Sequence, residues 1–187
     1  MVSAILEKSG PSAFDEDITL IERFLAGDQD AFEGLYHKYR DKVFAIAKGI
    51  LGDPEEAADT VQEVFTLVYR NLARFDRRAR FSTWLFRVAV NRSIQEARKH
   101  KHRPKPAELH EASAQEAPPP PAEADPRVEA AMAKLAPADR ALLVLFYWEE
   151  LSLLEIAESL GCSANAAKTR LYRARERFRI LFEREEE

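Results

Sequence analysis

The sequence predicts an all-α protein of two small helical domains joined by a flexible linker, with a helix-turn-helix in the second domain. Three observations support this prediction. Apolar residues recur at helical spacing through most of the 187 residues, no segment sustains the alternation typical of a strand, and one proline-rich stretch divides the chain. A chain of this length has room for one domain or for two small ones.

The first domain is predicted over residues 15–103, after an N-terminal arm of residues 1–14. Asp53 and Pro54 suit the start of a helix, because aspartate caps free backbone N–H groups and proline fits the first turn. Ser82 is the expected cap of the last helix of this domain. The apolar positions at helical spacing are Ile21, Phe24, Leu25, Phe32, Leu35, Tyr36, Tyr39, Val43, Phe44, Ala47, Ile50, Val61, Val64, Phe65, Val68, Leu72, Leu85, Val88, Ala89 and Ile94.

The linker is predicted over residues 104–126. Most of it, residues 106–126, contains six prolines, five acidic residues, one leucine and no aromatic residue. Such a segment cannot bury enough apolar surface to offset the entropy of ordering, so we expect it to join no core. Four consecutive prolines at 118–121 favour an extended polyproline conformation there.

The second domain is predicted over residues 127–184. Ser152 and Glu155 have the spacing of a capping box, in which each side chain caps the backbone of the other. Gly161 suits a left-handed stop for that helix, and Ser163 can cap the next one. A short helix, a turn containing glycine and a basic second helix form a helix-turn-helix pattern. The buried stripe expected on the second helix is Ala167, Leu171, Ala174 and Phe178.

Charge is segregated along the chain, although the net charge is only −4. Residues 70–105 hold twelve basic and two acidic side chains, and residues 165–184 hold seven and two. Two basic blocks inside an acidic protein indicate two surfaces for a polyanion. The alternative is a pair of solvated helix faces that bind nothing.

The second basic block lies on the predicted second helix of the helix-turn-helix. Four hydrogen-bond donors there fall off the apolar stripe, where they can reach phosphates and the N7 and O6 acceptors of guanine in a major groove. This pattern predicts DNA binding, whereas the alternative is a helix-turn-helix lookalike in a purely structural bundle. The four donors are Lys168, Thr169, Arg170 and Arg173.

The first basic block interleaves arginines with aromatic residues, which suits a strand whose bases are unstacked. Residues 74–81 are expected to form a loop that enters a helix, where a base can be captured. The alternative is that Phe81, Trp84 and Leu85 belong to the core and the arginines are merely solvated. Against it, like charges at this density repel one another unless an anion is present. The interleaved residues are Phe75, Phe81, Trp84 and Phe86 with Arg74, Arg77, Arg78, Arg80 and Arg87.

Few other residues are arranged for chemistry. A single cysteine, Cys162, excludes a disulfide framework and a Cys-cluster zinc site, and we interpret it as a packing residue. The four histidines form no H-E-x-x-H pair, so we expect no metal, no cofactor and no catalytic residue. No apolar run approaches the roughly 20 residues of a membrane span. Because the N-terminus also lacks the features of a signal peptide, we expect no membrane insertion and a cytoplasmic location.

Three segments carry a family resemblance. The first domain contains AADTVQEVFTLVYRNLARF and FSTWLFRVAVN, and the second contains LSLLEIAESLGCSANAAKTRLYRARERFR. The chain resembles, in this order, regions 2 and 4 of the extracytoplasmic-function group of bacterial sigma-70-type sigma factors. This resemblance covers nearly the whole chain outside the first dozen residues and the linker. It implies a factor that binds core RNA polymerase, directs it to promoters and helps to open the DNA.

The resemblance also implies roles for individual residues. The positions that match the family's contact with a coiled coil of the polymerase largest subunit are Asp59, Gln62, Glu63 and Phe65. Those expected to take part in capturing a flipped base of the −10 element are Phe75, Arg77, Arg78, Arg80, Ser82, Thr83, Trp84, Asn91 and Arg92. Those expected to read the −35 element are Ser163, Asn165, Lys168, Thr169, Arg170, Arg173 and Arg177.

The chain departs from the family pattern mainly at positions that bear on which promoter sequence it recognises. Gln95 replaces an acidic residue common in the family, and residues 163–166 read Ser-Ala-Asn-Ala in place of a Pro-x-Gly-Thr stretch. The resemblance further implies an anti-sigma partner. It also implies a linker near the path of the RNA, where acidic residues either imitate nucleic acid or belong to a simple tether. These residues are Glu108, Glu111, Glu116, Glu123 and Asp125.

Two rival functions fit the residues less well. A helix-turn-helix regulator that binds operator DNA by itself as a dimer should carry an obvious dimer helix, and no helical segment remains unassigned. An interaction protein with no nucleic-acid role would not need two basic blocks. We therefore predict a transcription initiation factor with no enzymatic activity.

Overall fold

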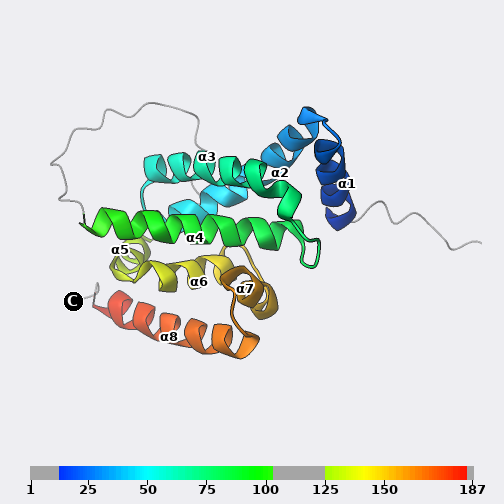
Figure 1. The fold of residues 1–187 in the computed structure, drawn as a ribbon. Helices are drawn as coiled ribbons and strands as arrows, with labels where there is room; N and C mark the ends of the chain where they lie inside the picture. Colours follow the sequence, from blue (N-terminus) through cyan, green and yellow to red (C-terminus); the bar gives the residue numbers. More distant parts are fainter. Residues whose placement is uncertain (1–12, 103–124, 185–187) are drawn as a thin grey trace, which may run out of the picture.

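The computed structural model describes residues 13–102 and 125–184, and over these two ranges it contains α-helices, one short 3-10 turn and no strand (Figure 1). The predicted all-α class is confirmed. The predictions for the N-terminal arm up to residue 12 and for residues 103–124 of the linker lie outside the described residues. The elements are α1 (Ala13–Leu25), α2 (Gln29–Leu51), α3 (Pro54–Asn71), η1 (Leu72–Arg74), α4 (Phe81–His102), α5 (Pro126–Lys134), α6 (Pro137–Tyr147), α7 (Leu153–Leu160) and α8 (Ala164–Glu183).

The first four helices pack around α2, which contacts α1, α3 and α4. Most of the predicted apolar positions are buried or half-buried, and Leu35, Val43, Val64 and Leu85 are fully buried. Leu25, at the end of α1, is the exception and is 48% exposed. Burying one such side chain contributes about 1.5–3 kcal/mol, so the apolar stripes rather than helix propensity account for most of this packing.

Most helix ends lie where the caps predict them. Asp53 accepts hydrogen bonds from the N–H groups of Glu55 and Glu56, and Pro54 begins α3. Gly52 ends α2 in the left-handed region, at φ 83°. In the second half, the predicted capping box at the start of α7 is present and Gly161 ends that helix at φ 63°. Ser163 caps α8, as expected.

The prediction that Ser82 caps α4 is wrong. The helix begins at Phe81, and the N–H of Trp84 already donates to the carbonyl of Arg80 at 3.2 Å. Phe81 is fully buried. Its burial contributes about 1.5–3 kcal/mol, whereas a serine cap contributes about 1 kcal/mol. Tertiary packing therefore sets this helix start.

The last helices form a second group, in which α8 packs against α5, α6 and α7. Asp125, which we assigned to the linker, is the N-cap of α5, and its side chain accepts from the N–H of Arg127. The helix itself starts at Pro126, one residue inside the predicted linker.

The two groups of helices also pack against each other, an arrangement that the sequence left open. Helix α6 contacts α2 and α4, and α7 contacts α4, so that α4 lies between α3 and α6 (Figure 1). Gly49 on α2 directly faces Val144 on α6. A Cβ at position 49 would lie 2.5 Å from Cγ2 of Val144, so the absence of a side chain permits this close approach.

Candidate nucleic-acid and polymerase interfaces

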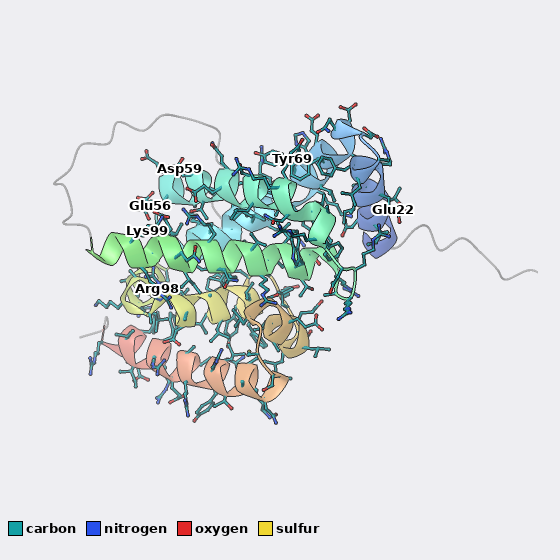
Figure 2. The ribbon with its side chains drawn as sticks, in the orientation of Figure 1. Glu22, Glu56, Asp59, Tyr69, Arg98 and Lys99 are labelled. Atoms are coloured by element: carbon teal, nitrogen blue, oxygen red, sulfur yellow. The ribbon has the colours of Figure 1, made fainter. Side chains whose placement is uncertain are left out.

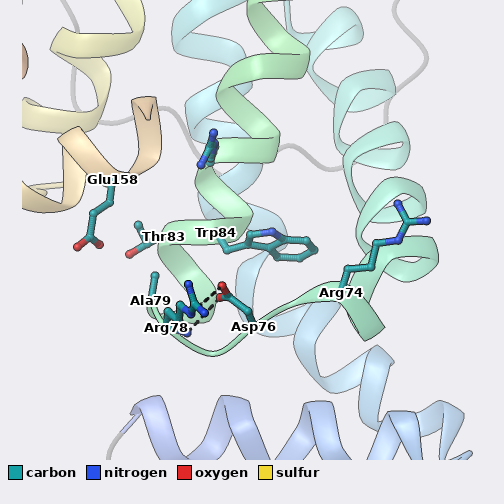
Figure 3. A pocket seen from close by; sticks show the side chains of 8 residues that line it. Arg74, Asp76, Arg78, Ala79, Thr83, Trp84 and Glu158 are labelled. Atoms are coloured by element: carbon teal, nitrogen blue, oxygen red, sulfur yellow. Dashed lines mark hydrogen bonds and ion pairs between the residues drawn. The ribbon is translucent and has the colours of Figure 1, made fainter. Parts of the chain in front are cut away.

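A hollow of about 480 Å³ opens where the loop before α4 meets the first turns of that helix (Figure 3). It combines cationic side chains with one indole face and one hydroxyl group. These are the groups that phosphates and unstacked bases require. The lining residues are Arg74, Asp76, Arg78, Ala79, Thr83, Trp84, Arg87 and Glu158.

Two local interactions shape the loop. The Asp76 carboxylate accepts a hydrogen bond from the N–H of Arg78 at 3.1 Å and turns the chain back toward α4. Arg77 lies in the left-handed region, at φ 60°, which is unfavourable for a residue with a side chain. Its guanidinium is 2.6 Å from Glu22 on α1, and this ion pair helps to hold the loop in place.

A cluster of aromatic side chains packs next to the hollow. Phe75 and Phe81 are buried, and the ring of Phe75 lies 5.8 Å from that of Phe81 and 5.6 Å from that of Trp84. Only the half-buried Trp84 reaches the lining of the hollow, so Phe75 is placed to support the indole from below. Phe81 and Leu85 belong to the core, as the alternative interpretation expected, while Trp84 lines the hollow.

Several of the clustered arginines have acidic partners within the protein. Arg78 lies 3.6 Å from Asp76, and Arg80 lies 3.7 Å from Glu155 on α7. Together with the Arg77–Glu22 pair, these contacts relieve part of the repulsion that the sequence suggested an external anion must relieve.

The remaining predicted −10 residues lie beside or beyond the hollow. Ser82 is half-buried in the first turn of α4. Asn91 is exposed two turns after Trp84, and seven residues of helix bring it back to nearly the same face. Arg92 forms ion pairs with Glu63 on α3 and Glu96 on its own helix, and the Glu63 hydrogen bond raises the pKa of Arg92.

The lining includes residues outside the set predicted for the −10 element. Arg74 and Arg87 belong to the basic block, and their interleaving with aromatics is the signal that could have placed them here. Glu158 belongs to α7, 71 positions beyond Arg87 in the sequence, and no local pattern could have brought it to this site.

The exposed face of α3 carries polar side chains in its middle and large apolar side chains near its C-terminal end. Asp59, Gln62 and Glu63 form the predicted polar edge and are exposed, whereas Phe65 is buried against Phe32 and Tyr36. Figure 2 shows Asp59 near one end of the helix and Tyr69 near the other.

An apolar surface surrounds the C-terminal end of α3. Tyr69 is 45% exposed, stacks edge-on against Phe24 and Phe32, and donates a hydrogen bond to Gln29. A second hollow of about 350 Å³ lies between the end of α3 and α4 and shares Arg74 and Trp84 with the first. This hollow is lined by Leu67, Asn71, Arg74, Trp84 and Val88.

Helix α8 presents the predicted donors on its outer side. Ala167, Leu171 and Ala174 are buried against the preceding helices. Arg177 is engaged with Asp139 on α6 at 2.6 Å, which anchors the helix. Besides Ser163 and Arg177, the predicted −35 residues Asn165, Lys168, Thr169, Arg170 and Arg173 are exposed.

Neither a metal centre nor a membrane span emerges from the described ranges. Among those residues, no group of three or more His, Cys, Asp or Glu side chains is placed to hold a metal ion. No helix within 13–102 or 125–184 has both the length and the apolar composition needed to cross a membrane.

A helix-turn-helix joined to a second helical domain with a basic, aromatic-lined hollow defines a class of DNA-binding transcription factors. Comparison with known sequences narrows this class. Residues 35–103 match the family model Sigma-70 region 2, and residues 126–178 match Sigma-70, region 4.

Full-length relatives agree with these matches. The ECF RNA polymerase sigma factor SigW of Bacillus subtilis (strain 168) is 35% identical over 177 residues, which cover 85% of this chain and 92% of SigW. The RNA polymerase sigma-H factor of Pseudomonas aeruginosa is 30% identical over 87% of this chain and 91% of the relative. The chain belongs to the sigma-70 family of RNA polymerase sigma factors, in its extracytoplasmic-function group. It is thus a transcription initiation factor that works with core RNA polymerase.

Solved structures share the fold. CnrH, in complex with the cytosolic domain of CnrY, aligns with a TM-score of 0.66 at 24% identity, over 90% of this chain and 98% of that one. RpoE of Bartonella quintana, in complex with the anti-sigma factor NepR, aligns with a TM-score of 0.61 at 19% identity, over 81% and 96%.

Proposed function

We propose that the hollow beside Trp84 holds an unstacked base of the −10 element while α8 reads the −35 element as duplex DNA. In this proposal the protein acts in the cytoplasm and has no enzymatic activity. The observation that carries it is the hollow itself, which three arginines line together with the half-buried indole of Trp84.

The chemistry of the hollow fits the cost of opening DNA. Extruding a base costs a few kcal/mol, and stacking it on an aromatic side chain returns about 1–3 kcal/mol. Arg74, Arg78 and Arg87 line the hollow, and their guanidinium groups suit the adjoining phosphates. Asn91, on the same face of α4, offers both donors and an acceptor to a neighbouring base.

The outer side of α8 suits a major groove. Arg170 and Arg173 lie three residues apart, nearly one helical turn, so both can enter one groove with Lys168 near its edge. Ser163, Asn165 and Thr169 occupy the N-terminal half of the same surface, where short polar side chains and free backbone N–H groups suit phosphate contacts.

Two protein partners complete the proposal. The polar edge of α3, with Asp59 and Gln62, suits a basic surface of core polymerase, and the buried Phe65 positions this edge. The solved sigma factors of this fold are held by CnrY and by the anti-sigma factor NepR, which supports an anti-sigma partner for this chain as well.

The test uses the two tryptophans of the chain. Trp84→Ala should reduce the permanganate reactivity of the promoter bubble about 5- to 150-fold, the loss that corresponds to 1–3 kcal/mol of stacking. Trp148→Ala is the matched control, because Trp148 is 52% exposed at the end of α6, and it should melt the promoter normally. Normal opening by the Trp84 variant would refute the base-capture role.

A further inference from the structure

The loop before α4 is held by helix α1, which lies outside the segment that matches Sigma-70 region 2. That match begins at residue 35, whereas α1 ends at Leu25. Helix α1 contacts η1, directly before the loop, and α4, directly after it (Figure 1). A helix in this position can determine how the loop between these two elements is held.

The contact in the middle of the loop is an ion pair. Nη1 of Arg77 lies 2.6 Å from Oε1 of Glu22, a residue of α1 that is 55 positions earlier in the sequence. Arg77 is not one of the residues that line the hollow, whereas its neighbours Asp76, Arg78 and Ala79 are (Figure 3). The side chain of Arg77 is therefore engaged with α1, while the residues on either side of it face the hollow.

The backbone at Arg77 requires such a contact. Its φ is 60°, and among the described non-glycine residues only Glu150 also has a positive φ. In the left-handed region the Cβ comes too close to the following carbonyl oxygen, so arginine is less stable there than glycine. Without Glu22, Arg77 can return to a negative φ, and this change would redirect Asp76 and Arg78 on either side of it.

A second path from α1 reaches the end of the loop. Asp17 accepts a hydrogen bond from the Tyr39 hydroxyl at 2.6 Å, and the ring of Tyr39 lies edge-on to that of Phe81, 5.5 Å away. Phe81 is the first residue of α4 and is fully buried. The end of the loop is thus fixed through the core, and its middle through the exposed pair. Substitution of Glu22 can therefore release the middle of the loop without disturbing the core.

We propose that Glu22 is a positioning residue for promoter opening, whose ion pair with Arg77 holds the loop in the conformation that accepts a −10 base. This inference rests on the proposed role of the hollow. It also gives Arg77 a role different from the one that the family resemblance implies, because its guanidinium is directed to α1 and not to DNA.

The first variant, Glu22→Gln, removes the ion pair and keeps the size of the side chain. We expect the reconstituted holoenzyme to open the promoter about two- to fivefold more slowly, the range that an exposed ion pair can supply. The measurement is the time course of permanganate reactivity in the bubble. Glu16→Gln is the matched control, because Glu16 is on the same helix but pairs with Lys38 on α2 at 3.1 Å. It should open the promoter at the wild-type rate, and both variants should bind a −35 duplex as wild type does.

Two substitutions of Arg77 distinguish a conformational role from direct contact with DNA. Arg77→Ala and Arg77→Gly both remove the guanidinium, but only glycine adopts a φ of 60° without strain. We expect the glycine variant to open the promoter about fivefold faster than the alanine variant, and Glu22→Gln to cause no further loss in the glycine background. Equal rates for the two variants would show that Arg77 acts through its charge and would refute the proposal.

The state of the loop can also be followed in the free protein. The chain has two tryptophans, so in a Trp148→Phe background the fluorescence comes from Trp84 beside the hollow. We expect Glu22→Gln to make Trp84 more accessible to quenching by acrylamide, and Glu16→Gln to leave it unchanged. Equal quenching with and without Glu22 would show that the pair does not hold the loop. Thermal unfolding followed by circular dichroism checks that each variant remains folded.

The outcomes separate this proposal from the proposed role of the hollow. If Trp84→Ala opens the promoter slowly but Glu22→Gln opens it at the wild-type rate, the positioning role is refuted and the role of the hollow stands. If Glu22→Gln changes the quenching of Trp84 while Trp84→Ala opens the promoter normally, Glu22 holds a loop that captures no base, and both proposals fail.

Discussion

At the scale of single residues, a buried carboxylate joins α1 to α2. Asp17 is 3% exposed, accepts a hydrogen bond from the Tyr39 hydroxyl at 2.6 Å, and forms an ion pair with Lys38 at 2.8 Å. Burial first, and then the nearby Asp17 carboxylate, raise the pKa of Tyr39 well above its ordinary value. The neutral phenol is therefore part of the folded state.

Tyr39→Phe should lower the free energy of unfolding by about 1–3 kcal/mol, because it removes one partner of a buried charge. The raised pKa also predicts a pH effect. Its stabilising contribution is complete below about pH 10, the pKa of an unfolded tyrosine, and is lost above it at up to about 1.4 kcal/mol per pH unit. Urea unfolding of wild type and Tyr39→Phe from pH 8 to 11 measures both effects. If the free energy of unfolding falls equally steeply above pH 10 in the two proteins, the predicted pH effect of Tyr39 is contradicted.

The scale of single elements shows which helix features the sequence can predict. Caps at Asp53, Ser152 and Ser163 depend on a few neighbouring residues, so spacing alone located them. The start of α4 depends on burial of Phe81 by distant helices, and it was missed. Helical spacing placed Phe65 in the apolar stripe of α3, where it is buried, whereas the resemblance assigned it to the polymerase contact.

On α8, Arg173 and Arg177 should respond differently to substitution. If Arg173 reads a base, Arg173→Ala should lose about 1–3 kcal/mol of discrimination at one or two −35 positions. If it holds a phosphate, affinity should fall for all sequences, with the salt slope reduced by about one unit. Arg177→Ala leaves Asp139 unpaired and should lower the melting temperature without changing base preference. Binding to −35 duplexes at several salt concentrations distinguishes them.

On α3, Asp59→Ala should weaken binding to core polymerase up to about fivefold, because an exposed ion pair contributes about 1 kcal/mol or less. Glu63→Ala provides a contrast, since Glu63 pairs with Arg92 on α4 and its loss should also reduce stability. A titration of labelled protein with core enzyme measures the first effect, and thermal unfolding measures the second. Equal core affinity of wild type and Asp59→Ala would remove Asp59 from the interface.

At the scale of the whole molecule, the sequence divided the chain into two helical parts but left their relation open. The contact between them depends on Gly49 meeting Val144 and on acids of α7 meeting arginines of the loop. Each of these pairs joins residues more than seventy positions apart, so no local pattern could show that the partners meet. The composition of the hollow was therefore predictable on the side of the basic block and not on the side of α7.

The linker prediction also belongs to this scale. A variant that combines Glu108→Gln, Glu111→Gln, Glu116→Gln and Glu123→Gln removes four of the five linker charges. It should alter the yield of abortive transcripts if the linker acids imitate nucleic acid near the RNA path. Asp125 is kept, because it caps α5. Transcription assays with the reconstituted holoenzyme give the comparison, and unchanged yields would identify the segment as a simple tether.

The contact at Gly49 gives one position an influence on how closely the two groups of helices pack. Each larger side chain at position 49 should push α6 further from α2. A series from glycine through alanine and serine to valine should then give a stepwise larger radius of gyration in solution scattering. The size of a single side chain would set the spacing between two parts of the molecule that lie far apart in the sequence.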